Sequence, residues 1–281
     1  MESSVRTTTL PCGEAIPVLG QGTWKMGEDS RRRADEVRAL KLGLDLGVTL
    51  IDTAEMYADG GAEVVVAEAI AGRRDETFLV SKVLPSNASR AGVRRACENS
   101  LKRLRTDRID LYLLHWPGSV PLTETVEAFE ALKQAGKIRH WGVSNFDTDE
   151  MQELALLSDG DKVQTNQVLY NLVRRGPEFD LTPWMRKRGI PLMAYSPVEQ
   201  GALARNARLD AVAARHGATA AQIALAWVML HDGDIAIPKA GSQEHVRQNF
   251  AALDIKLTPQ DVADLDRGFP QPTRKRGLEM I

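Results

Sequence analysis

The stretch VTLIDTAEMYADGGAEVVVAEAIAG (residues 48–72) contains the unit from which we predict the fold. Residues 48–52 form a short apolar and β-branched run, which is typical of a buried strand. Residues 62–72 have the length and the apolar spacing of a helix. A polar segment that ends in two glycines separates them. The stretch therefore predicts a strand followed by a crossover helix.

The same alternation recurs along the chain. Further apolar strand candidates lie at residues 18–24, 77–82, 109–115, 138–145, 162–167, 190–196 and 234–239. Amphipathic helical stretches follow several of them, at residues 31–47, 89–104, 122–136 and 147–157, and Gly136 ends one of these as a helix terminator. The units recur about every 30 residues, which leaves room for a helix to cross over to a parallel strand.

Eight such units predict an α/β fold, a (β/α)8 TIM barrel with a closed parallel sheet of eight strands. The units are not similar to one another in sequence, which disfavours a solenoid. An open doubly wound sheet is the stronger competitor, but no Gly-x-Gly-x-x-Gly opens a helix. Gly20-Gln21-Gly22 is a lone Gly-x-Gly that we interpret as a tight turn. No linker divides the chain, so we expect one domain over residues 1–281.

The segment TTTLPCGEAIPVLG (residues 7–20) lies outside this repeat. It contains two short runs on either side of a Gly-Glu turn, a pattern that favours a β-hairpin. We expect this hairpin to cover the floor of the barrel.

The composition is that of an ordinary globular protein. The 281 residues are 43% hydrophobic and 26% charged, with a net charge of −2, which excludes a strongly basic nucleic-acid binder and a disordered chain. The longest apolar run, residues 223–230, is far shorter than the roughly 20 residues that span a bilayer. Two cysteines, Cys12 and Cys97, favour a reducing, cytoplasmic location. We expect no membrane or nucleic-acid partner, and a monomer.

Polar residues stand where the predicted strands end. They are Asp52, Lys82, His115, Asn145, Gln167, Tyr195 with Ser196, and Lys239. Active sites of such barrels lie at the C-terminal ends of the strands. Each residue also has a simpler explanation: Asp52 suits a helix cap, His115 a hydrogen-bonded structural role, and Tyr57 plain packing. Their convergence on one face favours a functional site.

The chemistry of these side chains favours carbonyl reduction. A phenol has a pKa near 10, which a nearby ammonium lowers, so we expect Lys82 to lower the pKa of Tyr57 while Asp52 holds the ammonium. Tyr57 would then protonate a carbonyl oxygen that His115 orients. The reaction needs a hydride carrier. Ser144, Asn145 and Gln167 suit the carboxamide of a nicotinamide, and Tyr195 suits stacking on its ring.

The chain resembles the aldo-keto reductase superfamily over nearly its whole length, and most closely its bacterial methylglyoxal and aldehyde reductases. The matching segments are LIDTAEMY (50–57), LVSK (79–82), LLHWP (113–117), GVSNF (142–146), QTNQVLYN (164–171), AYSP (194–197) and IPKAGSQEHVRQN (237–249). The resemblance implies the catalytic set Asp52, Tyr57, Lys82 and His115. It implies cofactor binding by Ser144, Asn145, Gln167, Tyr195, Ser196, Pro197, Lys239, Ser242, His245 and Asn249.

The resemblance implies reduction of small aldehydes and α-dicarbonyls with NADPH, with NADH as a weaker alternative. Lys239 at the strand end and Ser242 as a helix cap favour NADPH, since both would face its 2′-phosphate. His245 stands where many members of the family have arginine, so its charge would depend on pH. We expect a substrate pocket formed by Trp24, Met56 and Trp116.

Other positions depart from the family pattern. Leu84 replaces a common tryptophan, which lowers one wall of the pocket. Residues 58–62 differ from the usual loop after the catalytic tyrosine. The segment 116–121 and the tail after Phe269 are short, so we expect an open site with modest selectivity.

Three other functions compete with reduction. Lys82 could form a Schiff base as in an aldolase, although a neighbouring carboxylate such as Asp52 raises a lysine's pKa and disfavours this. Metal-dependent hydrolysis is disfavoured because only His115 of the five histidines ends a strand, so we expect no metal and no ligand cluster. A non-catalytic cofactor sensor is disfavoured by the complete set of four catalytic residues.

Overall fold

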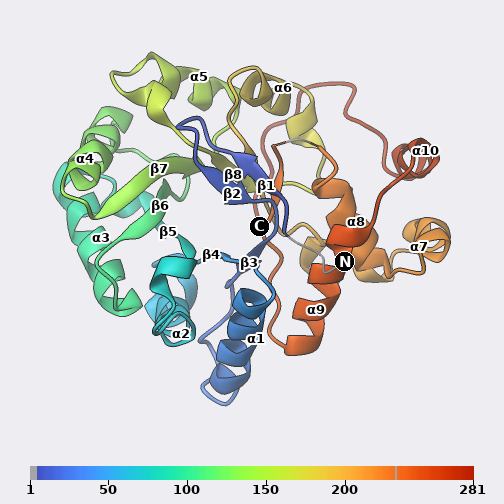
Figure 1. Cartoon of the computed structure of the whole chain (residues 1–281). Helices are drawn as coiled ribbons and strands as arrows, with labels where there is room; N and C mark the ends of the chain where they lie inside the picture. Colours follow the sequence, from blue (N-terminus) through green and yellow to red (C-terminus); the bar gives the residue numbers. More distant parts are fainter. Residues whose placement is uncertain (1–4, 232) are drawn as a thin grey trace.

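The computed structural model describes residues 5–231 and 233–281, and its largest feature is a parallel sheet whose strand order follows the chain (Figure 1). The strands are β3 (Gly20–Gly22), β4 (Leu50–Asp52), β5 (Phe78–Val83), β6 (Ile109–Leu114), β7 (Ile138–Ser144), β8 (Asn166–Leu169), β9 (Leu192–Tyr195) and β10 (Ile235–Ala236). Each pairs in parallel with the next.

The first and last strands of this sheet meet and close it into a barrel. Parallel bridges join Leu19 to Ala236 and Gly22 to Lys239, and the Gly22 amide donates a hydrogen bond to Pro238 O at 3.1 Å. The predicted (β/α)8 barrel with a parallel eight-stranded sheet is confirmed.

The interpretation of Gly20-Gln21-Gly22 as a tight turn is wrong, because these residues form strand β3. The glycines are needed for close approach at the seam of the barrel. A Cβ atom on Gly22 would lie 2.7 Å from Ile237 O, and one on Gly20 would lie 3.0 Å from Ile237 Cγ2. Larger residues would therefore hold the closing strands apart.

The predicted strand at 162–167 also starts in the wrong place. Residues Gly160–Lys162 form a short 3-10 helix, and β8 runs over Asn166–Leu169. Gly160 fits tightly there, since an added Cβ would lie 1.8 Å from Leu154 O. Gln167 consequently stands within β8 and not at its end.

Helices surround the ring of strands (Figure 1). They are α1 (Arg33–Asp45), α2 (Gly61–Ala69), α3 (Arg90–Leu104), α4 (Leu122–Gln134), α5 (Thr148–Leu156), α6 (Leu181–Arg186), α7 (Asp210–His216), α8 (Ala220–Val228), α9 (Gln243–Ala251) and α10 (Pro259–Gly268). Gly136 follows α4 with a φ of +69°, as a terminating glycine does. In the described part of the chain, no helix combines the length and apolar character that crossing a membrane requires.

The antiparallel hairpin of β1 (Thr7–Thr9) and β2 (Ala15–Pro17) crosses the middle of the ring (Figure 1). Its side chains Leu10 and Ile16 are 1% and 0% exposed and belong to an inner apolar cluster with residues of several barrel strands. A second, larger cluster fills the space between strands and helices. The hairpin therefore plugs the barrel interior, and its predicted place at the floor is confirmed.

This packing gives a direct test of the plug. Leu10→Ala should lower the free energy of unfolding by about 2–5 kcal/mol, because it removes buried methyl groups and leaves a cavity. Leu156→Ala is the matched control, since Leu156 is 87% exposed on α5 and its truncation should change little. Urea unfolding followed by circular dichroism measures both. Equal changes in the free energy of unfolding for the two substitutions would contradict the inference that the hairpin plugs the barrel interior.

Candidate active site

A buried lysine lies at the centre of the predicted catalytic group. Lys82 on β5 is 0% exposed, and its ammonium donates hydrogen bonds to Asp52 Oδ2 at 2.8 Å, to Thr53 O at 3.0 Å and to Tyr57 Oη at 3.1 Å. Asp52 ends β4, the strand beside β5, so sheet pairing places the two charges together. All three N–H donors of the ammonium are used, and the buried charge is fully paired.

Tyr57 reaches this lysine from the turn that follows β4. It begins a 3-10 helix over Tyr57–Gly60 in which Ala58 and Asp59 have φ values of 50° and 52°. Left-handed backbone at two successive non-glycine residues is unusual and costs free energy. The loop therefore holds the phenol over Lys82 at the expense of local strain.

The pKa of Tyr57 differs from the value that the sequence led us to expect, whereas that of Lys82 agrees with the expected direction. Burial raises the pKa of Tyr57 above its usual value, and the positive charge of Lys82 offsets only part of that effect. The predicted net lowering of the Tyr57 pKa is therefore wrong. Burial by itself would lower the pKa of Lys82, but Asp52 and Tyr57 raise it overall. The lysine is thus held as an ammonium, which is not nucleophilic and counts against the Schiff-base alternative.

His115 follows β6 and lies beside the phenol. Its ring centroid is 5.8 Å from that of Tyr57, at an angle of 73°, and the residue is 7% exposed. Burial and the nearby charge of Lys82 lower the pKa of His115 to about 2. The ring is therefore neutral at physiological pH and has one N–H to donate. Nδ1 is buried and makes no hydrogen bond with the described residues.

The residues predicted to bind nicotinamide form one connected set with the catalytic group. Gln167 Nε2 donates to Asp52 Oδ1 at 2.7 Å, and Ser144 Oγ donates to Gln167 O at 2.8 Å. Asn145, with a φ of 58°, donates to His115 O at 3.0 Å and accepts from Tyr195 Oη at 2.9 Å. These bonds fix the side chains before any ligand binds.

A cavity of about 690 Å³ opens above this set. Nearly all predicted site residues line it: Trp24, Asp52, Met56, Tyr57, His115, Trp116, Ser144, Asn145, Gln167, Tyr195, Ser196, Pro197, Lys239, His245 and Asn249. Lys82 lies beneath the cavity, and Ser242 lies outside its lining. The Ser242 side chain instead accepts a hydrogen bond from His245 N at the start of α9, so its predicted role as a helix cap is confirmed.

Lys239, which lines the cavity, lies close to a second cation, Arg32. A Cβ atom on Gly241 would lie 2.9 Å from an Arg32 nitrogen and 3.0 Å from Lys239 Nζ. Burial and the charge of Arg32 lower the pKa of Lys239, and Glu36 and Glu28 offset only part of that effect. Arg32 was not predicted, because it precedes α1 in a loop and follows no strand. Two cations placed this close together are suited to a bound anion.

The C-terminal tail also reaches the cavity, which the expectation of an open site missed. Met280 and Ile281 are part of its lining. Lys275 pairs with Asp147 and with Asp180, and Arg174 pairs with Glu279 at 2.7 Å. The tail is short, but these ion pairs hold it across the mouth.

Comparison with known proteins agrees with this geometry. The profile of the Aldo/keto reductase family matches residues 18–268, and the chain belongs to that family. It is 53% identical over 272 residues to the methylglyoxal reductase YeaE of Escherichia coli, covering 95% of this chain and 96% of that protein. It is 33% identical over 268 residues to the glyoxal reductase of Bacillus subtilis, covering 95% and 94%.

Solved structures of aldo-keto reductases have the same fold as this chain. An aldo/keto reductase from Klebsiella pneumoniae in complex with NADP and acetate superposes with a TM-score of 0.96 at 53% identity, covering 99% of this chain and 100% of that one. The aldo-keto reductase from the same organism in complex with NADPH has the same TM-score and identity, covering 99% of each chain. The predicted family is confirmed, and the fold and the enzyme class agree with it.

The lowered pKa of His115 leads to a prediction for its ring. The ring nitrogens should show no titration from about pH 9 to about pH 5, because burial and Lys82 disfavour the imidazolium. Nitrogen NMR of histidine-labelled protein measures this, and the signal that disappears in His115→Gln provides the assignment. The same residue in denaturant should titrate near pH 6.5. A midpoint near that value in the folded protein would contradict the assigned environment.

Proposed function

We propose that this protein reduces small aldehydes and α-dicarbonyls of the methylglyoxal type to alcohols, with NADPH as hydride donor and Tyr57 as proton donor. The observation that carries the proposal is the buried chain from Asp52 through Lys82 to the Tyr57 hydroxyl, beside a neutral histidine at the bottom of a 690 Å³ cavity. Two relatives of the chain, a methylglyoxal reductase and a glyoxal reductase, support the substrate class.

The cavity has the groups that NADPH needs. Ser144, Asn145 and Gln167 offer amide and hydroxyl groups for a carboxamide, and Tyr195 offers a ring for stacking. Lys239 and Arg32 supply positive charge for a phosphate at the far end. The N-terminus of α9, capped by Ser242, adds a favourable dipole for an anion. NADP and NADPH occupy the related Klebsiella structures, which supports the choice of cofactor.

The residues of the chain then have separate tasks in the reaction. NADPH, when bound, supplies the hydride for the carbonyl carbon. His115 donates a hydrogen bond to the carbonyl oxygen and orients it, which its neutral state allows. Tyr57 gives its proton to the same oxygen, so that the C=O group becomes an alcohol. Lys82 stabilises the phenolate that is left, and Asp52 balances the lysine charge.

The walls of the cavity favour small substrates. Trp24, Met56 and Trp116 line it near the catalytic group, while Leu84 is not part of the lining. The tail at Met280 and Ile281 narrows the mouth. Compact activated carbonyls should therefore fit better than steroids. We further infer a monomeric cytoplasmic enzyme, because one chain supplies the whole site and both cysteines are free, Cys12 on the surface.

Removing the phenolic hydroxyl tests this function. Tyr57→Phe should lower kcat for methylglyoxal about 10²–10⁴-fold, because only the proton donor is lost. The dissociation constant of NADPH, measured by protein fluorescence, should change little. NADPH oxidation is followed with methylglyoxal, an aromatic aldehyde and a steroid ketone, which also ranks the substrates.

Two results would contradict the proposal. Wild-type turnover by Tyr57→Phe would remove Tyr57 from the chemistry. Efficient turnover of the steroid by the wild-type enzyme, with negligible activity on the aldehydes, would exclude the small-carbonyl class.

The cation pair predicts the choice between NADPH and NADH. Lys239→Met should weaken NADPH binding about tenfold or more and leave NADH nearly unchanged, because the two cofactors differ only in the 2′-phosphate. Arg32→Met should act in the same direction. Lys256→Met is the matched control, since Lys256 is exposed and does not line the cavity. Equal losses for both cofactors in Lys239→Met would remove this lysine from the phosphate site.

A further inference from the structure

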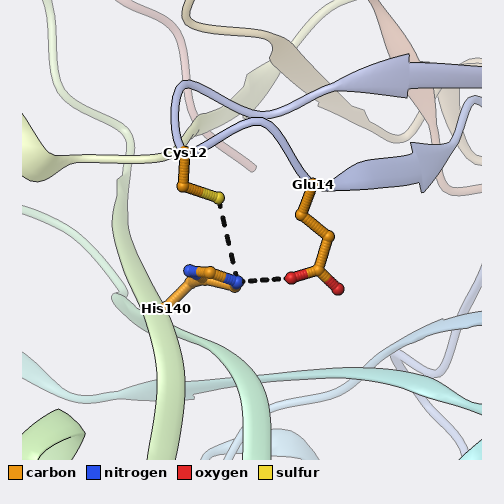
Figure 2. Close-up of side chains that lie close together, drawn as sticks. All are labelled: Cys12, Glu14 and His140. Carbon is orange, nitrogen blue, oxygen red and sulfur yellow. Dashed lines mark hydrogen bonds and ion pairs between the residues drawn. The ribbon is translucent and has the colours of Figure 1, made fainter.

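Three potential metal ligands meet on the barrel floor, away from the cavity. Figure 2 shows Cys12 and Glu14 of the hairpin pointing toward His140 of β7. His140 Nε2 lies 2.7 Å from Glu14 Oε2 and 3.9 Å from Cys12 Sγ. One ligand atom from each residue lies within 4.8 Å of the others. The expectation of no ligand cluster, based on strand-ending histidines alone, is therefore wrong.

The backbone around these residues is well fixed. Gly13, with a φ of 90°, makes the tight turn between Cys12 and Glu14, and its amide donates to Leu10 O at 2.8 Å. The Cys12 amide donates to Gln164 Oε1 at 2.9 Å. His140 is paired with Leu111 in the sheet. The three side chains therefore start from positions set by the hairpin plug and by the barrel itself.

The arrangement does not fit a thiol activated for nucleophilic attack. In such a group the carboxylate binds the imidazole nitrogen opposite the one that faces the nucleophile. Here the thiol and the carboxylate both face Nε2. Nδ1 is buried and has no hydrogen-bond partner among the described residues. Glu14 forms a hydrogen bond with His140 Nε2, and Cys12 Sγ approaches the same nitrogen, so one atom of each side chain lies close enough to the others to share an ion.

We infer that Cys12, Glu14 and His140 bind a zinc ion, with water completing the coordination. Sulfur, imidazole nitrogen and carboxylate oxygen are the ligands that zinc takes in proteins. A tetrahedral zinc ion separates its ligand atoms by roughly 3.3–3.7 Å, given bond lengths of about 2.0–2.3 Å. The sulfur–nitrogen distance of 3.9 Å is already close to this. The nitrogen–oxygen pair must open by a small rotation of Glu14.

The neighbouring charges allow a divalent ion. Arg139 donates to Glu14 Oε2 at 2.7 Å and so shares that carboxylate. Arg139 also forms an ion pair with the buried Asp110 at 3.0 Å. The guanidinium therefore still has a carboxylate partner when Glu14 rotates toward the ion. The thiolate and the carboxylate together balance the two charges of zinc. The ion would tie the hairpin that plugs the floor to strand β7.

Cobalt substitution tests the site directly. The purified wild-type protein, freed of metal, should bind one Co²⁺ per chain and develop a thiolate-to-cobalt charge-transfer band that Zn²⁺ abolishes. Cys12→Ser should lose this band, because the sulfur ligand is gone. His140→Gln should weaken Zn²⁺ binding about 100-fold in competition with a chromophoric chelator, since even an outer partner of a metal ligand contributes 10–100-fold.

The second cysteine supplies the matched control. Cys97 is buried in the apolar core, and Cys97→Ala should keep the cobalt band. Zn²⁺ should raise the Tm of the wild-type protein but not that of Cys12→Ser. Because Cys12 is exposed, the substitution itself should leave the Tm of the metal-free protein unchanged. No band in the wild-type protein, a band that persists in Cys12→Ser, or unchanged binding in His140→Gln would each overturn the site. None of these measurements depends on the reductase activity.

Discussion

The structure of the active site depends on one buried charge pair, Lys82 with Asp52. An ammonium without exposure to water costs several kcal/mol unless its partners are placed well. Here the ammonium uses all three donors, and Asp52 uses one oxygen for Lys82 and the other for Gln167. The pair therefore fixes strands β4, β5 and β8 relative to one another at the mouth. Tyr57 completes the coordination of the lysine, so the same requirement that pairs the charge also places the phenol.

The two ends of the barrel are built differently for physical reasons. The floor is closed by apolar side chains of the hairpin, such as Leu10 and Ile16, and gains its stability from burial. The mouth has strained backbone, with positive φ at Ala58, Asn145 and Ser196. Each of these residues belongs to a loop or strand end beside the cavity. The well-packed floor and the paired charges compensate for this strain, which is expected where side chains must point into a ligand site.

The sequence predicted the barrel and most of the cavity because both follow from local patterns. An apolar run that ends in Asp52 or His115 identifies a strand and its mouth-facing end together. The missed features depend on contacts between distant segments. Arg32 lies near Lys239, and Cys12 lies near His140, although more than a hundred residues separate the members of each pair in the sequence. Neither pair belongs to a recognisable sequence motif. The pKa of Tyr57 was predicted in the wrong direction because the sequence shows the neighbouring ammonium but not the depth of burial.

The raised pKa of Tyr57 is consistent with its proposed role as a proton donor in carbonyl reduction. Reduction consumes a proton, so the donor must hold its proton when the substrate arrives, and burial of Tyr57 favours the protonated phenol. An alkoxide formed at the carbonyl oxygen is far more basic than a phenolate, so the proton moves to it readily. The phenolate that results stands 3.1 Å from an ammonium whose own pKa is raised. In the proposed reaction Lys82 would therefore stabilise this phenolate electrostatically without giving up its own proton, and the cavity that Tyr57 lines would give water access to restore the phenol.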